Sequence, residues 1–301
     1  IYHKLRFILD GKIMILAAGV SSRMKKPDDT ITADEKLIHE ADTISKSMIG
    51  VGKDNRPFMD YLLFNITEAG YREVLFIINE KDEFIKKYYK LENENDKKLG
   101  NLNLSFTVQS IPEGRSKPMG TADAVFQGMM SRPDWSGGKF TVCNSDNLYS
   151  VNTLKLLLNS DKKNSMINYD LKGLRFTDDR HKKFAVISVS KNGYLRSIIE
   201  KPSEKEIEKL KEEMGYTGIS MNIFKFDYDL MFPYFQNTPL THGRDEKEIP
   251  TTINLMIKDH VDGMFTYKVC EHVPDMTSKK DLIETQKYLE SEFNLDRPFL
   301  G

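Results

Sequence analysis

The chain has 301 residues, a formal net charge of −1 and two cysteines. A net charge this close to zero gives no electrostatic reason to expect binding to nucleic acid or to an anionic membrane surface. Two cysteines provide neither a disulfide framework nor a zinc-binding spacing, and no apolar run approaches the ~20 residues that span a bilayer, so we expect a cytoplasmic protein.

Apolar runs typical of buried strands alternate along the chain with amphipathic helical patterns. The predicted strands lie at the start of residues 13–23 and at 73–79, 104–109, 140–144, 165–169, 183–189, 194–199, 218–226 and 265–269. The predicted helices cover residues 34–41, 57–69, 84–91, 121–130, 152–159, 204–214, 230–235, 248–258 and 278–293. This alternation predicts an α/β fold in which a mostly parallel central sheet carries helices on both faces.

We assign residues 1–301 to a single domain, because the length suits one large α/β domain and the sequence shows no internal repeat. Residues 25–45 are polar and rich in charge, and we interpret them as a solvated insertion rather than as a lid over a substrate. No run of hexapeptide repeats follows Asp259, so we expect no C-terminal β-helix domain. The sequence leaves homo-oligomer formation open.

The first strand leads into a loop of small residues, Gly19, Ser21 and Ser22, which ends at Arg23. A glycine lets the backbone turn sharply or approach a ligand closely, and the serine hydroxyls can donate hydrogen bonds. The guanidinium of Arg23 offers a planar set of donors suited to phosphate oxygens. A strand followed by such a loop is a place to hold a nucleotide, although an ordinary turn with one surface arginine fits the same residues.

Two further stretches carry cations near predicted elements. Residues 113–120 are rich in glycine, arginine and lysine, and they precede the helix predicted to begin at Thr121. A helix N-terminus attracts anions through its dipole and its free amide groups, although a capped helix after a flexible loop fits the same pattern. Lys46 stands beside a short apolar stretch, from which it would reach a phosphate, although a lone lysine is usually solvated.

Carboxylates follow two of the predicted strands. Asp146 comes shortly after the strand at residues 140–144, and Asp227 follows the strand at 218–226. Open α/β sheets bind ligands at the carboxyl ends of their parallel strands, and hard divalent metals prefer carboxylate oxygens. We therefore expect Asp227 to face Asp146 at a metal site, while the competing interpretation of Asp146 is a cap for the helix at 152–159.

Taken in order, these motifs resemble those of the sugar-1-phosphate nucleotidyltransferases, the nucleotide-sugar pyrophosphorylases. The matching residues are Leu16-Ala17-Ala18-Gly19-Val20-Ser21-Ser22-Arg23-Met24, Lys46, Gln109, Gly120-Thr121-Ala122, Asn144-Ser145-Asp146-Asn147, Glu200-Lys201-Pro202 and residues 218–227. Each motif is weak alone, and it is their order along the chain that points to this superfamily. The resemblance implies a Rossmann-like fold of the nucleotidyltransferase, or GT-A-like, type.

The resemblance also implies a role for each matching residue. The nucleotide would lie against Leu16, Ala17, Ala18, Gly19, Ser21, Ser22, Gln109, Gly120 and Thr121. Arg23 and Lys46 would bind its phosphates, and Asp146 with Asp227 would hold Mg²⁺. Glu200 and Lys201, with Asn222, would bind the sugar phosphate. The implied catalytic residues are Arg23, Lys46, Asp146 and Lys201.

The chain departs from the family pattern in three places. Val20 and Ser21 stand where a second glycine is usual. The stretch between Arg23 and Lys46 is longer than usual, and a serine rather than a proline precedes the lysine. The segment before Asp227 lacks its usual glycine, which leaves Asn222 as an alternative metal ligand.

The implied reaction condenses a nucleoside triphosphate with a sugar-1-phosphate and releases pyrophosphate, with Mg²⁺ as cofactor. Such a transfer needs positioning and charge stabilisation rather than covalent help from the protein. A phosphate monoester is already largely ionised near neutral pH, so no general base is required. We accordingly predict that His3, His181, His242 and His272 are surface residues without a catalytic role.

Three other functions remain open. The first is a cytidylyltransferase that acts on an alcohol phosphate such as phosphocholine, although Glu200-Lys201-Pro202 favours a sugar. The second is a non-catalytic nucleotide or sugar-phosphate sensor, which would not need all four implied catalytic residues. The third is a GT-A-like glycosyltransferase, which would need an Asp-X-Asp motif, whereas Leu148 follows Asn147 here. The identity of the base and of the sugar is not specified by these motifs.

Overall fold

The computed structural model describes residues 11–28, 33–80, 82–95, 102–241, 243 and 245–293. Its strands are β1 (Gly11–Ala17), β2 (Tyr71–Asn79), β3 (Asn103–Gln109), β4 (Lys139–Asn144), β5 (Asn164–Asp170), β6 (Ala185–Val189), β7 (Leu195–Ile199), β8 (Gly218–Ser220), β9 (Ile223–Asp227) and β10 (Met264–Val269). Its α-helices are α1 (Glu35–Thr43), α2 (Phe58–Ala69), α3 (Glu83–Asn95), α4 (Thr121–Ser131), α5 (Val151–Leu158), α6 (Asp178–His181), α7 (Glu204–Met214), α8 (Tyr228–Gln236), α9 (Ile249–Asp259) and α10 (Lys280–Glu292).

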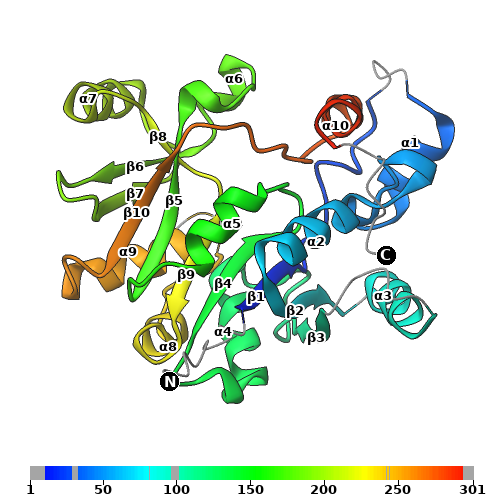
Figure 1. Ribbon diagram of the computed structural model, residues 1–301, viewed down its shortest axis with the longest axis horizontal. Helices are drawn as coiled ribbons and strands as arrows, with labels where there is room; N and C mark the ends of the chain where they lie inside the picture. Colours follow the sequence, from blue (N-terminus) through cyan, green and yellow to red (C-terminus); the bar gives the residue numbers. More distant parts are fainter. Residues whose placement is uncertain are drawn as a thin grey trace, which may run out of the picture.

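The strands form one sheet in the order β3-β2-β1-β4-β9-β5-β8-β6-β7, and β10 pairs with β5 outside this path. The β3-β2-β1-β4 part is parallel, as is the β5–β10 pair. β9 enters antiparallel between β4 and β5, and the β8-β6-β7 part is antiparallel. The α/β fold with helices on both faces is therefore confirmed, with a sheet that is mixed at its second half (Figure 1).

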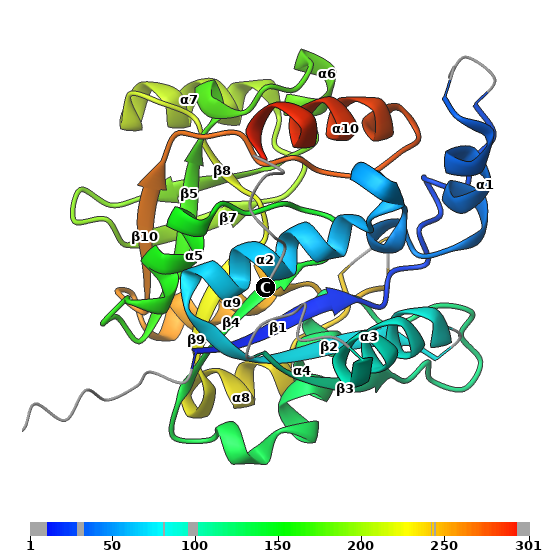
Figure 2. The same cartoon turned by 45° about the vertical axis from the view of Figure 1, so that its right-hand side comes forward.

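Alternate side chains of the buried strands feed two cores. In β1, Ile13 and Ile15 enter the core beneath α2, α3, α5 and α10, whereas Met14 enters the core beneath α4, α8 and α9. Figure 2 shows α2 and α10 on one side of β1 and α4 and α8 on the other. A strand buried on both faces needs a continuous apolar run, and each fully buried side chain of this kind contributes ~1.5–3 kcal/mol. The core thereby fixes β1 as the central strand that presents the first loop.

The predicted strand at residues 218–226 is two strands in the structure. β8 ends at Ser220 and β9 begins at Ile223, and between them Asn222 adopts a left-handed backbone with φ of 55°. Asparagine tolerates this conformation better than most residues, and the conformation interrupts the extended chain. β9 therefore pairs with β4 rather than continuing along β6.

The segment at residues 25–45 contains helix α1, close to its predicted position. Asp34 caps this helix by accepting a hydrogen bond from the Lys36 amide, and Leu37 and Ala41 are buried against the core. Glu40 accepts a hydrogen bond from the Gly50 amide at 2.8 Å. The helix thus docks its apolar face on the core, while its other residues are exposed or partly exposed, and the interpretation of the segment as a solvated insertion stays a prediction.

Among the described helices, none combines the length and the apolar character needed to cross a membrane.

Candidate active site

A cleft of about 280 Å³ opens where β1 and β4 end. Its walls come from the loop after β1, the loop at Ser45 and Lys46, the end of β3, the start of α4 and the segment before α9. The predicted site residues that line it are Leu16, Ala17, Ala18, Gly19, Ser21, Lys46, Gln109, Gly120, Thr121 and Asp146. The structure thus gathers residues from five separate stretches at the carboxyl ends of parallel strands, where α/β sheets bind ligands.

Two glycines in the cleft wall, Gly19 and Gly120, have different roles. A Cβ at Gly19 would meet no atom within 4 Å, so this position leaves open space beside the cleft. Gly120 has a φ of 104°, and a Cβ there would lie 2.4 Å from the carbonyl oxygen of Lys247. Gly120 is therefore required by the fold at the start of α4, whereas Gly19 is free to accommodate a ligand.

Alanine at these two glycines is expected to separate binding from folding. Gly120→Ala forces a strained backbone against Lys247 and should lower the free energy of unfolding by ~1–3 kcal/mol. Gly19→Ala should leave that free energy within ~0.5 kcal/mol of the wild type, while its methyl group occupies cleft space. We expect nucleoside triphosphates to bind Gly19→Ala at least ~10-fold more weakly than the wild type. Titration measures this affinity, and chemical denaturation measures the free energy of unfolding of both variants. Unchanged nucleotide affinity in Gly19→Ala would exclude close approach of the ligand at that loop.

Gln109 is held in one orientation by the protein. Its side-chain amide nitrogen donates to the carbonyl oxygen of Gly120 at 2.9 Å and to the carboxylate of Asp123 at 2.8 Å. Gln109 is almost fully buried, yet it lines the cleft. Since both amide hydrogens have partners in the protein, the carbonyl oxygen of Gln109 is the group left to face a ligand.

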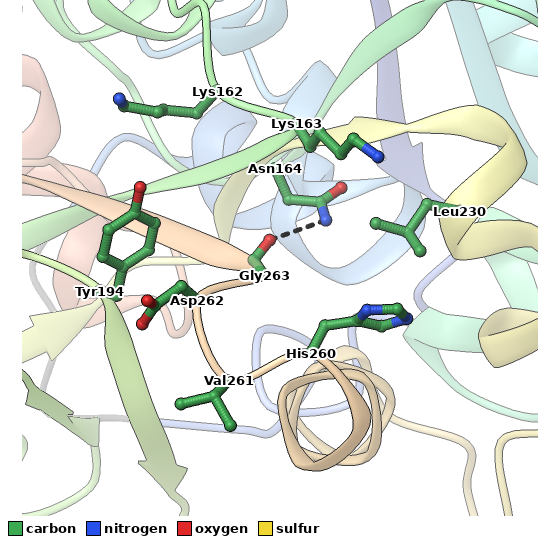
Figure 3. A pocket seen from close by; sticks show the side chains of 9 residues that line it. All are labelled: Lys162, Lys163, Asn164, Tyr194, Leu230, His260, Val261, Asp262 and Gly263. Atoms are coloured by element: carbon green, nitrogen blue, oxygen red, sulfur yellow. Dashed lines mark hydrogen bonds between the residues drawn. The ribbon is translucent and has the colours of Figure 1, made fainter.

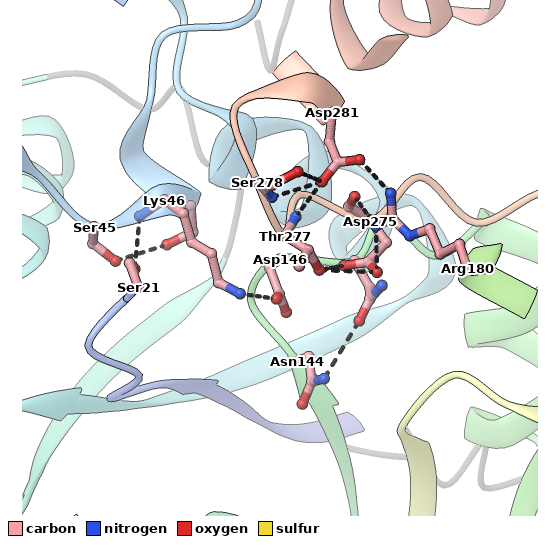
Figure 4. A network of polar contacts seen from close by, with 12 residues as sticks. Ser21, Ser45, Lys46, Asn144, Asp146, Arg180, Asp275, Thr277, Ser278 and Asp281 are labelled. Carbon is pink, nitrogen blue, oxygen red and sulfur yellow. Dashed lines mark hydrogen bonds and ion pairs between the residues drawn. The ribbon is translucent and has the colours of Figure 1, made fainter. Parts of the chain in front are cut away.

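The cation of the Lys46 side chain lies directly on the carboxylate of Asp146 (Figure 4). The Lys46 amide also donates to the Ser21 hydroxyl at 3.4 Å, so the lysine is tied to the loop after β1. Both side chains are mostly buried, with 18% and 14% of their surfaces exposed. Removing one partner of such a buried ion pair strongly destabilises the folded protein, because the charge of the other partner is then left without compensation.

A second carboxylate, Asp275, lies beside Asp146. The backbones of Asn147 and Asp275 form an antiparallel bridge, in which the Met276 amide donates to the Asp146 carbonyl at 2.9 Å. Burial and the charge of Asp146 raise the pKa of Asp275 above its ordinary value, and the positive charge of Arg180 opposes this rise. We did not predict Asp275 from the sequence, because no motif that we could recognise surrounds it.

Asp227 does not reach this site, and the expectation that it faces Asp146 is wrong. Because β9 runs antiparallel to β4, Asp227 pairs with Lys139 at the beginning of β4, whereas Asp146 follows its end. At ~3.3 Å per residue, the length of β4 alone separates the two carboxylates by more than about 15 Å. The Asp227 carboxylate instead caps α8 by accepting from the Leu230 amide at 3.0 Å.

Asn222 lies at the same edge of the sheet as Asp146, near the end of β4. It directly precedes Ile223, which pairs with Cys143 near the end of β4. The hydroxyl of Tyr149 donates to the Met221 carbonyl at 2.7 Å and so fixes the backbone there. The structure therefore brings the alternative ligand, rather than Asp227, to the end of β4.

Four further predicted residues do not line the cleft. Ser22, Arg23, Glu200 and Lys201 are all exposed. Lys201 has a left-handed backbone with φ of 49°, and Ser21 has one with φ of 54°. With Asn222, three predicted site residues are thus among the six described non-glycine residues with positive φ. Such backbone strain costs of order 1–3 kcal/mol and clusters at functional sites, which favours a binding role for these segments.

A second hollow, of about 390 Å³, lies at the opposite edge of the sheet, where β5 and β10 begin (Figure 3). There the side chain of Asn164 donates to the Gly263 carbonyl at 2.9 Å, and Lys162 and Asp262 lie at the rim. None of the predicted site residues lines this hollow. We therefore identify the cleft at the ends of β1 and β4 as the candidate active site.

Two histidines are more buried than predicted. His181 and His272 are both partly buried, so their expected surface placement is wrong, while His3 and His242 lie outside the described residues. The ring of His272 packs edge-on against Phe176, with centroids 4.9 Å apart. Burial, together with the smaller effect of the positive charges of Arg175 and Arg180, lowers the pKa of His272 to about 4.

The pKa of His272 predicts a loss of stability in mild acid. An unfolded chain protonates this histidine near its ordinary pKa of 6.5, whereas the folded protein resists protonation down to about 4. The unfolded state therefore binds more protons between these values, and stability falls as the pH drops through this range, by at most about 3 kcal/mol. Chemical denaturation at several pH values should show this slope in the wild type and a weaker slope in His272→Gln. Equal slopes would exclude His272 as the source.

Comparisons with known proteins agree with this site. The sequence model of the nucleotidyl transferase family, described as "Nucleotidyl transferase", matches residues 36–288. The bifunctional protein GlmU of Staphylococcus epidermidis is 23% identical over 282 residues, which cover 93% of this chain and 53% of the relative. Glucose-1-phosphate adenylyltransferase 2 of Vibrio parahaemolyticus is 24% identical over 229 residues, 74% of this chain and 50% of the relative. The chain thus spans about half the length of the curated relatives it matches.

Solved structures share the fold. UDP-glucose pyrophosphorylase in complex with UDP-glucose superposes with a TM-score of 0.66 at 16% identity, covering 93% of this chain and 98% of that one. HddC from Yersinia pseudotuberculosis gives a TM-score of 0.61 at 15% identity, covering 93% and 99%. At these identities the likeness establishes the fold, and the family match establishes the ancestry. The resemblance found in the sequence motifs is confirmed, and the chain belongs to the nucleotidyl transferase family.

Proposed function

We propose that the protein transfers a nucleotidyl group from a nucleoside triphosphate to a sugar-1-phosphate, giving a nucleotide sugar and pyrophosphate. The observation that carries this proposal is the ion pair of Lys46 and Asp146 in the cleft beside the loop after β1, with Asp275 held next to Asp146 by the Asn147–Asp275 bridge. A cation tied to a small-residue loop suits a triphosphate, and two adjacent carboxylates suit the metal that accompanies it. The polar groups of the cleft thus match a metal–nucleotide complex.

Asp146 and Asp275 fit Mg²⁺ by the chemistry of their oxygen atoms. Within the described part of the chain, no three His, Cys, Asp or Glu residues are grouped to hold a metal by themselves. Mg²⁺ is usually bound through one or two carboxylates, with substrate phosphates and water filling its other positions, so a pair is sufficient. When bound, Mg²⁺ would neutralise charge on the phosphates and orient them.

Lys46 changes its partner in this proposal. Without substrate, its ammonium group pairs with the Asp146 carboxylate that would otherwise be available to a metal. A triphosphate offers Lys46 a more highly charged partner, so its arrival would draw the ammonium group away from Asp146. Bound nucleotide would therefore strengthen metal binding, because it frees the carboxylate of Asp146.

The acceptor side is assigned to Glu200, Lys201 and Asn222. The exposed cation of Lys201 would hold the sugar phosphate against its repulsion from the triphosphate, while Arg23 and Lys46 neutralise the leaving pyrophosphate. An oxygen of the sugar phosphate attacks the α-phosphorus in line, and the bond to the pyrophosphate oxygen breaks. The nucleophile is already ionised, so the residues act by positioning and by charge rather than by proton transfer.

We place this reaction in the cytoplasm, where the free thiols Cys143 and Cys270 stay reduced.

The test is product identification by mass spectrometry. The protein would be mixed with Mg²⁺, one of ATP, CTP, GTP, UTP and dTTP, and either a hexose-1-phosphate or phosphocholine. A nucleotide sugar formed together with pyrophosphate, and only when both substrates are present, supports the proposal. A product from CTP and phosphocholine would favour the cytidylyltransferase instead. Nucleotide binding without any product would indicate a sensor and contradict the proposed reaction.

A further inference from the structure

Arg180 contacts two carboxylates at the edge of the proposed site. It lies on α6, in the connection between β5 and β6, and reaches across to the turn that precedes α10 (Figure 4). Its guanidinium donates to the Asp275 carboxylate and to the Asp275 carbonyl, each at 2.7 Å. The other terminal nitrogen contacts the carboxylate of Asp281. One planar group thus holds both the backbone and the side chain of Asp275.

The contacts of Arg180 are shielded from water and supported on both sides. The exposed side-chain fractions are 19% for Arg180, 13% for Asp275 and 7% for Asp281. The guanidinium carbon also lies 4.4 Å from the centre of the Phe176 ring, which fixes the plane of the group. Charge-assisted hydrogen bonds in such surroundings are strong and directional, so Arg180 restricts the orientation of Asp275.

Asp281 serves the turn rather than the cleft. Its carboxylate, in the first turn of α10, accepts from the amides of Thr277 and Ser278, at 2.9 and 2.6 Å, and so holds the turn that precedes the helix. Lys279 in the same turn is nearly buried and pairs with Asp42 of α1 at 2.6 Å. The turn is therefore anchored to α10 and to α1, and Arg180 connects this anchored turn to Asp275.

The charges of the group match a divalent cation once Lys46 has left. Asp146, Asp275 and Asp281 carry three negative charges, and the guanidinium of Arg180 carries one positive charge. The group then has a net charge of −2, which one divalent cation would neutralise. A guanidinium rather than an ammonium suits this position, because its fork satisfies two carboxylates from one side.

We infer that Arg180 is a positioning residue that orients Asp275 toward the divalent cation of the active site. This inference rests on the proposed function only in taking Asp146 and Asp275 as the metal-binding pair. Groups that hydrogen-bond to metal ligands set the orientation of those ligands, and their loss typically weakens metal binding by 10–100-fold. Sequence motifs could not show this role, because Arg180 stands on a helix of four residues far from Asp275 in the chain.

The experiment measures Mn²⁺ binding to the whole chain by electron paramagnetic resonance of the free ion. Arg180→Gln should raise the dissociation constant for Mn²⁺ by ~10–100-fold. Arg180→Lys should lie between this variant and the wild type, because an ammonium can hold one carboxylate but cannot bridge two. The matched control is Arg175→Gln, which removes an exposed arginine of the same connection that pairs with Glu292 of α10 at 3.7 Å. The control should bind Mn²⁺ as the wild type does.

A second measurement separates positioning from a general loss of structure. Binding of inorganic pyrophosphate in EDTA reports the Lys46 side of the cleft without metal, and it should be unchanged in Arg180→Gln. Loss of pyrophosphate binding together with Mn²⁺ binding would overturn the inference in favour of a structural role. If Arg180→Gln does not fold, Arg180→Lys decides, and a wild-type Mn²⁺ affinity in that variant would overturn it as well.

The outcomes also distinguish this inference from the proposed function. Wild-type protein that binds Mn²⁺ in an Arg180-dependent manner, but forms no nucleotide sugar, would leave the role of Arg180 intact and reject the reaction. Wild-type protein that forms product, with Mn²⁺ affinity indifferent to Arg180, would reject the role and leave the reaction intact.

Discussion

Asp146→Asn is expected to lower kcat/KM by ~1,000-fold or more while the protein stays folded. Asparagine has nearly the same shape, but it removes the negative charge that lies at the end of β4 and that we assign to the metal. Asp275→Asn should have a comparable effect, because the two carboxylates act as a pair across the Asn147–Asp275 bridge. The measurement is the rate of pyrophosphate release at saturating Mg²⁺, with circular dichroism as the check on folding.

The matched control for these variants is Asp262→Asn. Asp262 is an exposed carboxylate at the rim of the hollow on the opposite edge of the sheet. Its removal should leave turnover unchanged. Turnover lost in Asp262→Asn, or kept in either Asp146→Asn or Asp275→Asn, would place the chemistry elsewhere than at the ends of β1 and β4.

Lys46→Met is expected to change the affinities for metal and for triphosphate in opposite directions. The variant removes the cation that competes for Asp146, so free Mn²⁺ should bind at least ~10-fold more tightly. It also removes a charge-assisted contact to the triphosphate, so nucleotide binding in EDTA should weaken by ~10–100-fold. Both constants can be measured by titration of the same preparation.

Lys53→Met provides the control for the Lys46 variant, because Lys53 is an exposed lysine in the same connecting segment and does not line the cleft. Neither affinity should change in this control. Weaker binding of both ligands to Lys46→Met would contradict the exchange of partners, since it would show that Lys46 supports the metal site rather than competing for it.

The sequence was sufficient to predict the parallel part of the sheet and the loop after β1. The apolar run around Ile13 and Ile15 is long enough to be buried on both faces, and such runs have few alternatives to a central strand. The small residues after β1 and Asp146 after β4 come together at one edge of the sheet through topology alone. Lys46 follows helix α1 rather than a strand, so only the family resemblance assigned it to the same site as Asp146 before their contact was seen.

The errors came from long-range pairing that local patterns do not contain. Asp227 ends an apolar strand just as Asp146 follows one, but the direction of β9 relative to β4 decides which edge it reaches. The left-handed backbone of Asn222 separates β8 from β9, and nothing in the composition of residues 218–226 shows this break. Asp275 is brought next to Asp146 by an isolated bridge to Asn147, outside any strand, so no strand pattern in the sequence could predict its place in the site.

The most direct measurement is a crystal structure of the protein with Mn²⁺ and a non-hydrolysable nucleoside triphosphate. We expect the anomalous signal of Mn²⁺ between the carboxylates of Asp146 and Asp275, with the ammonium group of Lys46 moved onto the triphosphate. Mn²⁺ bound away from these carboxylates, or a Lys46 side chain still on Asp146 beside bound nucleotide, would contradict the assignment of this cleft as a nucleotidyl-transfer site.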